Sequence, residues 1–234
     1  MHIMNKSIYK NNVSIGITKS LVLISFFLML MHILWYISCN LFGNQSFFTK
    51  ILYALFSIDL EMTIPAWYQG LLLMACAISI IINDLIIKLP LNKYCILFSI
   101  IFITLSIDEV ITIRERIEGF YYKYFLNRGY ILSFEHDLIF SFLVLSLIIL
   151  IAYISIKFLS LHNNYNRKLF ILSGFIYVFG ALGLDLIGSN FEDKMSLIYQ
   201  ISTMLEELFE MIGLIIFLHV MSSIIFSKLK NLHT

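Results

Sequence analysis

Long apolar stretches, interrupted by short polar segments, recur along the whole sequence. Each stretch holds about 18 or more residues, which is the length that a helix needs to cross the hydrocarbon core of a bilayer. The segments between them are too short to form a soluble domain, so we expect a single membrane domain over residues 1–234. The pattern predicts an all-α, polytopic integral membrane helix bundle of about six transmembrane helices, at residues 20–41, 66–87, 94–113, 138–157, 169–190 and 203–226.

The composition agrees with a lipid environment. Hydrophobic residues make up 60% of the chain and charged residues 13%, whereas an ordinary soluble domain carries about 25% charged residues. Lys6, Lys10 and Lys19 precede the first apolar run as in a signal peptide, but the run exceeds the usual length of about 7–15 residues. No small-residue cleavage site follows it. We therefore expect a retained first span and a multi-pass protein whose main partner is the lipid bilayer.

The charged residues predict which way the bundle faces. Lys and Arg are enriched in cytoplasmic segments of membrane proteins. If the N-terminus lies inside, ten of the sixteen Lys and Arg residues fall in cytoplasmic segments. Fourteen of the fifteen acids then fall outside, with Asp84 as the exception. The distribution predicts that both termini are cytoplasmic.

Asp108, Asp185 and Glu210 are among the acids that lie inside predicted spans. At about 1.5 Å per residue, they lie about 22, 26 and 27 Å from the nearest cytoplasmic lysine. The hydrocarbon core is about 30 Å thick, so all three should lie near its outer boundary at a similar height. A charged carboxylate at the centre of a bilayer costs at least about 2.5–3.5 kcal/mol. We therefore expect these side chains to face the bundle interior rather than lipid.

Polar and small residues share one helix face in four of the predicted spans, because helical neighbours recur every three or four residues. Lipid does not satisfy such groups, so the four stripes are expected to line a shared outer vestibule. The small residues of 174–188 are expected to allow close helix approach. The stripes consist of Ser25, His32, Tyr36 and Cys39; Thr104, Asp108, Thr112 and Glu115; Gly174, Ala181, Asp185, Gly188, Ser189 and Glu192; and Glu206, Glu210, Gly213 and Phe217.

Four sequence blocks extend this interpretation. They are SIDLEMTIPAWYQ (57–69), LSIDEVITIRERI (105–117), GALGLDLIG (180–188) and EELFEMIG (206–213). Together they resemble the signature blocks of an uncharacterised family of bacterial polytopic membrane proteins. The family shows a His-Glu pair where this chain has Arg114-Glu115. The resemblance implies a multi-pass protein of a bacterial inner or plasma membrane, and it implies no particular reaction.

The clustered acids suggest a site for a cation. Carboxylates concentrate cations electrostatically, rings of Asp and Glu favour cation pores, and hard cations prefer oxygen ligands. The first hypothesis is therefore an outward-facing, carboxylate-rich site that binds a cation, in a transporter, channel or sensor. If the cation is a divalent metal, the candidate ligands are Asp108, Glu109, Asp185, Glu206, Glu210 and His136.

Two alternatives use the same residues differently. In a membrane-embedded, metal-dependent hydrolase acting on a lipid or a periplasmic substrate, the carboxylates would hold the metal, with His136 or His32 completing the shell. In a structural or interaction protein, the acids would only cap helices and pair with bases such as Arg114 and Arg116. The sequence leaves open whether the protein is an enzyme and whether it forms a homo-oligomer. It shows no basic stripe suited to nucleic acid.

Overall fold

A computed structural model of the chain describes residues 2–43, 46–60, 62–87, 91–121, 133–188, 190, 191, 193 and 195–231. At residues 2–13, 87, 114, 115, 118, 121, 133–144, 185, 230 and 231 it describes the backbone alone. All regular elements in the described residues are helices, so the predicted all-α class is confirmed. They are α1 (His2–Phe42), α2 (Phe47–Phe56), α3 (Ile64–Ile87), α4 (Lys93–Ile111), α5 (Ile113–Tyr121), α6 (Ser133–Ser160), α7 (Asn164–Val178), η2 (Phe179–Leu184), α8 (Asp185–Gly188) and α9 (Leu197–Asn231).

Five helical segments of the described chain are long and apolar enough to cross a membrane. They coincide with five of the six predicted spans. The remaining predicted span, 138–157, lies within α6, whose side chains are described only from residue 145 onward. The number of spans therefore remains a prediction. The five segments are Ser14–Phe42, Ile64–Ile86, Lys93–Ile111, Asn164–Gly188 and Leu197–Leu229.

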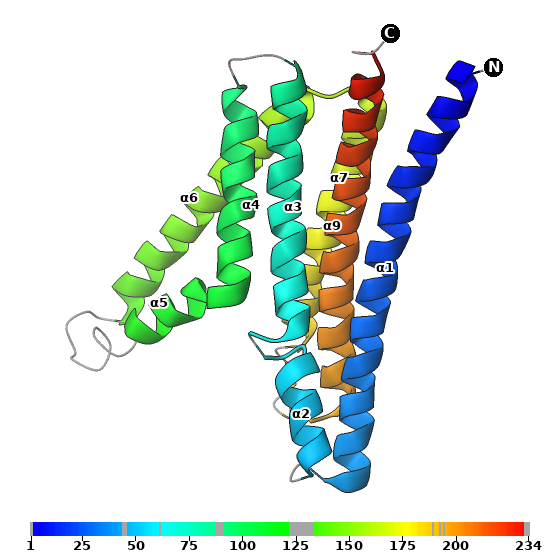
Figure 1. Ribbon diagram of the computed structural model, residues 1–234. Coiled ribbons are helices and arrows are strands. Elements are labelled where there is room, and N and C mark those ends of the chain that lie inside the picture. Colours follow the sequence, from blue (N-terminus) through cyan, green and yellow to red (C-terminus); the bar gives the residue numbers. More distant parts are fainter. Residues whose placement is uncertain are drawn as a thin grey trace.

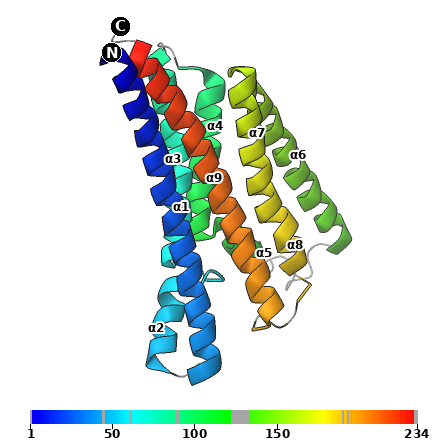
Figure 2. The ribbon, with the colours of Figure 1, turned by 90° about the vertical axis from the view of Figure 1, so that its right-hand side faces the viewer.

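The long helices form an elongated bundle in which α9 occupies the centre (Figures 1 and 2). α9 packs against α1, α3 and α7, and α4 packs against the far side of α3. The first turn of α1 and the last turn of α9 lie at the same end of the bundle. α6 leans away from the other helices towards the opposite end (Figure 1). The N-terminal turns of α3 and α9 and the C-terminal turns of α4 therefore come together away from the termini.

A large apolar cluster occupies the half of the bundle nearer the termini. Leu73, Cys76 and Ile80 of α3 are fully buried in one cluster with Met211 and Met221 of α9. A group of aromatic rings from four helices, α4, α6, α7 and α9, continues this cluster. Its members are Phe98, Phe102, Phe158, Phe170 and Phe217.

Two glycines allow α9 to lie directly against α7 and η2. A Cβ atom added at Gly213 would lie 2.8 Å from the backbone nitrogen of Tyr177, and one added at Gly180 would lie 2.8 Å from the carbonyl oxygen of Glu206. Gly174 has nothing within 4 Å of such an atom. The expected close approach is therefore present, but it depends on Gly180 and Gly213 rather than on every small residue of the segment.

Two backbone features depart from the regular helices that the pattern predicts. Thr112 adopts a left-handed conformation with φ of 55°, so α4 ends at Ile111 rather than at residue 113. α5 then turns aside from the axis of α4 (Figure 1). The second departure is η2, a six-residue π-helix in the middle of the fifth predicted span. A π-helical turn within an α-helix frequently marks a functional site.

Candidate functional site

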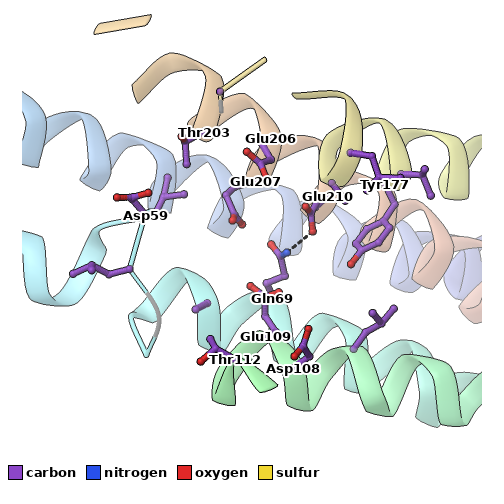
Figure 3. A pocket seen from close by; sticks show the side chains of 18 of the residues that line it. Asp59, Gln69, Asp108, Glu109, Thr112, Tyr177, Thr203, Glu206, Glu207 and Glu210 are labelled. Carbon is purple, nitrogen blue, oxygen red and sulfur yellow. Dashed lines mark hydrogen bonds between the residues drawn. The ribbon is translucent and has the colours of Figure 1, made fainter. Parts of the chain in front are cut away.

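A cavity of about 800 Å³ lies between α3, α4, α7, η2, α8 and α9, and Ile151 of α6 and the segment before α3 also line it. Its walls come from the turns that meet at the end of the bundle away from the termini. Six of the described residues that line it are acids. No described lining residue is Lys, Arg or His. The acids are Asp59, Asp108, Glu109, Glu206, Glu207 and Glu210, shown from close by in Figure 3.

Four of the predicted site residues therefore line one cavity. Asp108 and Glu109 reach it from the last turn of α4, and Glu206 and Glu210 reach it from one face of α9. Positions four residues apart share a helix face, which explains why Glu206 and Glu210 enter the cavity together. The structure thus brings together acids that are about 100 residues apart in the sequence.

Gln69 and Glu210 form the end of the cavity nearest the apolar core. Gln69 Nε2 donates a hydrogen bond of 2.6 Å to Glu210 Oε2. The Gln69 side chain is only 1% exposed, and that of Glu210 is 7% exposed. Gln69 Oε1 is buried and has no hydrogen-bond partner within the described part of the chain. The ring of Tyr177 lies beside Glu210 on the same side (Figure 3).

Asp59 and Tyr199 form the other end. The hydroxyl of Tyr199, in the first turn of α9, donates a hydrogen bond of 2.6 Å to Asp59 Oδ1. Asp59 lies in the short segment between α2 and α3. The Thr112 and Thr203 hydroxyl groups add further oxygen atoms to the wall. The polar lining thus consists almost entirely of hydrogen-bond acceptors and hydroxyl groups.

Helix electrostatics do not account for the acids of α4. A helix dipole stabilises anions near the N-terminus and disfavours them near the C-terminus. Asp108 and Glu109 lie in the last turn of α4, where the dipole opposes a negative charge. Their position next to the glutamates of α9 adds like-charge repulsion. A purely structural capping role therefore does not explain this pair.

Two of the acids that line the cavity, Asp59 and Glu207, are not among the site residues that the sequence predicts. Asp59 belongs to a Ser-Ile-Asp triplet at 57–59 that recurs at 106–108, and this repeat was a usable signal. Glu207 follows Glu206 directly, and adjacent residues on a helix point about 100° apart, so the spacing gave no reason to include it. The π-helical turn and Gly180 place η2 close enough to α9 for Ala181 and Leu182 to complete the wall.

Some of the predicted site residues lie outside the described residues, and others lie away from the cavity. The side chains of Asp185 and His136 lie outside the described residues. Thr104 is exposed, and its hydroxyl donates to the Ile100 carbonyl oxygen, so the expected stripe of α4 begins only at Asp108. The stripe of α1 packs inside the bundle and contributes no described residue to the cavity.

His32 does not complete a metal shell in this arrangement. It is 2% exposed, and both ring nitrogens have partners. Nε2 lies 2.9 Å from Gln200 Oε1, and Nδ1 accepts from the Ile58 backbone nitrogen at 3.3 Å. The expectation that His32 is available as a ligand is therefore wrong, because neither ring nitrogen is left for a metal. Of the two arginines proposed as partners for the acids, Arg116 donates from Nε to the Ile111 carbonyl oxygen; the Arg114 side chain lies outside the described residues.

The acids are gathered around the cavity but do not converge on one point. Among the described residues, no three His, Cys, Asp or Glu side chains form a group that is able to hold a metal ion. Hard divalent cations need several oxygen atoms at about 2.0–2.6 Å from a common centre.

Comparison with known proteins identifies a family but no activity. A family model described as "Domain of unknown function (DUF8692)" matches residues 19–225. No curated protein and no solved structure matches the chain. The expected membership of an uncharacterised family is thereby confirmed. Because the match covers most of the chain, this protein belongs to the family described as Domain of unknown function (DUF8692).

Proposed function

We propose that this protein is an integral membrane protein of six spans, with both termini in the cytoplasm and with an outward-facing cavity that binds a cation. The observation that carries the proposal is the lining of that cavity, which has six acids and, among its described members, no base. The apolar helices support the membrane location. The common end of the first and last helices supports an even number of spans.

The electrostatic reason for a cation is straightforward. Carboxylates that share a site of low dielectric constant cannot all ionise without protons, bases or cations as partners. The glutamates of α9 and the acids of α4 face one another across the cavity (Figure 3). The described walls supply no basic side chain. A bound cation relieves the repulsion, and it also neutralises Asp108 and Glu109 at the unfavourable end of α4.

The shape of the cavity favours binding over free passage. Along α9 no described lining residue lies beyond Glu210, and the next turns carry Met211, Leu214 and Phe217 into the apolar core. The polar residues at the far end of the bundle have local partners instead. Lys228 Nζ donates to Asn83 Oδ1 at 2.7 Å, and Asp84 Oδ2 accepts from the Asn92 backbone at 2.6 Å. These observations favour a sensor or one state of a transporter over an open channel.

The proposal is tested by cation binding to the full chain in phosphatidylcholine nanodiscs at neutral pH. Calorimetry with Na⁺, Ca²⁺, Mn²⁺, Zn²⁺ and an aliphatic polyamine covers the main cation classes. We expect at least one of these cations to bind. We expect the double variant E206Q/E210Q to bind that cation about tenfold more weakly or worse, since each substitution removes a charge-assisted contact. D193N is the matched control, because Asp193 is an exposed acid that does not line the cavity. Absence of binding by every cation would overturn the proposal.

A further inference from the structure

The buried amide oxygen of Gln69 gives information about the ligand that the acids alone do not give. Gln69 lines the cavity, its Nε2 donates to Glu210, and its buried Oε1 has no hydrogen-bond partner in the described part of the chain. A buried acceptor without a partner is unfavourable, and such groups in proteins nearly always have one. Gln69 Oε1 therefore calls for a ligand atom that donates a hydrogen bond or carries positive charge.

The size of the cavity argues for an organic ligand rather than a bare ion. At about 800 Å³ the cavity falls in the range of about 300–1,000 Å³ that is typical of small-molecule sites. A single water molecule occupies only about 30 Å³ in the liquid. The described acids also do not converge as metal ligands do. An ion alone would leave most of the cavity to water.

The acceptors are spread along the cavity instead of surrounding one point. Tyr199, which binds Asp59, marks one end, and Glu210, which binds Gln69, marks the other end. Glu210 lies eleven positions after Tyr199 on α9, a rise of about 16 Å. Glu206 lies between these ends, four residues before Glu210. A ligand with several positive groups in a row matches this spacing.

Apolar side chains line the space between the acceptors. Leu105 of α4, Val178 of α7 and Leu182 of η2 all face the cavity. They offer a favourable surface to methylene groups, because burial of apolar carbon removes it from water. An anionic group would meet six carboxylates, so a phosphate-bearing amine such as a phospholipid headgroup is disfavoured.

We propose that the cavity binds a protonated aliphatic polyamine, and this rests on the proposed cation-binding function. The ammonium group at the closed end lies next to Glu210 and donates an N–H to Gln69 Oε1. Further ammonium groups face Glu206 and Asp59, while the methylene groups between them contact Leu105 and Leu182.

Spermidine binding to the full chain in phosphatidylcholine nanodiscs tests this proposal. Spermidine is compared with its fully N-methylated, quaternary analogue, which keeps the charges but has no N–H group. We expect the analogue to bind about tenfold more weakly or worse, since it cannot donate to the buried amide oxygen or to the carboxylates. Mn²⁺ and Ca²⁺ at equal concentration should not displace spermidine. Nanodiscs that contain phosphatidylethanolamine should give the same spermidine affinity.

Two variants assign the effect to this cavity. Q69L should weaken spermidine binding by about tenfold and abolish the preference over the methylated analogue. Q200L is its matched control, because Gln200 is also buried and hydrogen-bonded but does not line the cavity. A181F narrows the cavity and leaves every acid in place. It should therefore block spermidine binding and spare any binding of Ca²⁺ or Mn²⁺. It provides a second test if Q69L does not fold.

The outcomes separate this inference from the proposed function. If Ca²⁺ or Mn²⁺ binds in a manner that depends on Glu206 and Glu210 while spermidine does not bind, the polyamine is wrong and the cation site stands. If the methylated analogue binds as tightly as spermidine, the proposed ligand chemistry is wrong. It is also wrong if phosphatidylethanolamine displaces spermidine. If no cation binds, both proposals are overturned.

Discussion

Gln69 Nε2 and Glu210 Oε2 lie 2.6 Å apart and join α3 to α9 at the closed end of the acidic cavity. The two residues are 141 positions apart in the sequence. Their hydrogen bond is the described polar link between the two walls at this level. It therefore connects the stability of the bundle to the geometry of the site.

Removal of the Gln69 amide should destabilise the protein. In Q69L the buried Glu210 carboxyl group loses its donor, and an unsatisfied buried polar group costs about 1–3 kcal/mol. Unfolding of the purified protein by sodium dodecyl sulfate in mixed micelles measures this loss. E210Q keeps an oxygen that can accept from Gln69, so it should cost less than Q69L. Equal stability of Q69L and the wild type would show that the contact does not form.

The close approach of α7 and α9 should make Gly213 intolerant of a side chain. An added Cβ would lie 2.8 and 2.9 Å from backbone atoms of Tyr177 and Ser173, which cannot move without shifting a helix. G213A should therefore cost about 1–3 kcal/mol, as overpacked sites do. G174A is the matched control, because nothing lies within 4 Å of its new Cβ. Its unfolding free energy should match or slightly exceed the wild-type value, since alanine favours a helix more than glycine does. Equal effects of the two variants would contradict the packing described for Gly213.

His162 should make stability fall in mild acid. It lies in the turn between α6 and α7, with Nδ1 3.0 Å from the Phe158 carbonyl oxygen and with its ring against Phe170. Burial lowers the pKa of His162 from its ordinary value of 6.5, and the charges of Lys228 and Arg167 lower it further, against the raising effect of the Phe158 carbonyl.

The sign of the effect follows from proton binding. Below about pH 6.5 the unfolded chain protonates this histidine before the folded chain does, so the free energy of unfolding decreases as the pH falls. The contribution of neutral His162 to the free energy of unfolding is fully present above that pH. It is completely lost once the pH lies below the pKa of His162 in the folded protein. Melting curves between pH 5 and 8 for the wild type and H162Q measure it. Their difference should change across this interval, and parallel curves would show that His162 does not contribute.

Reporter groups should place the two loops on either side of α6 on opposite faces of the membrane. We expect a single cysteine at position 127 to react with an impermeant maleimide from outside, and one at position 164 to react only after the membrane is opened. Cys39, Cys76 and Cys95 are buried, so they should contribute little background labelling. Labelling of both positions from the same face would overturn the six-span topology and the outward orientation of the cavity.

Much of the architecture was determined by the sequence. Within lipid every backbone polar group needs an internal partner, so long apolar runs have to form helices. Five predicted spans accordingly coincide with helices long enough to cross a bilayer. The same reasoning placed Asp108, Glu206 and Glu210 towards the interior, because lipid does not solvate a carboxylate. Helical periodicity depends only on neighbours along the chain, so it can be read from the sequence.

Only the tertiary structure decided which faces meet. Helical periodicity predicts that Thr104 and Asp108 lie on the same side of α4. In the bundle, however, α4 is rotated so that Asp108 lines the cavity while Thr104 stays exposed. Periodicity likewise does not reveal that Gln69 meets Glu210 or that Asp59 joins the acids. The rotation and depth of each helix result from packing of the whole bundle, including the contacts of Gly180 and Gly213 with neighbouring backbone. These contacts link residues far apart in the chain, and no local pattern encodes them.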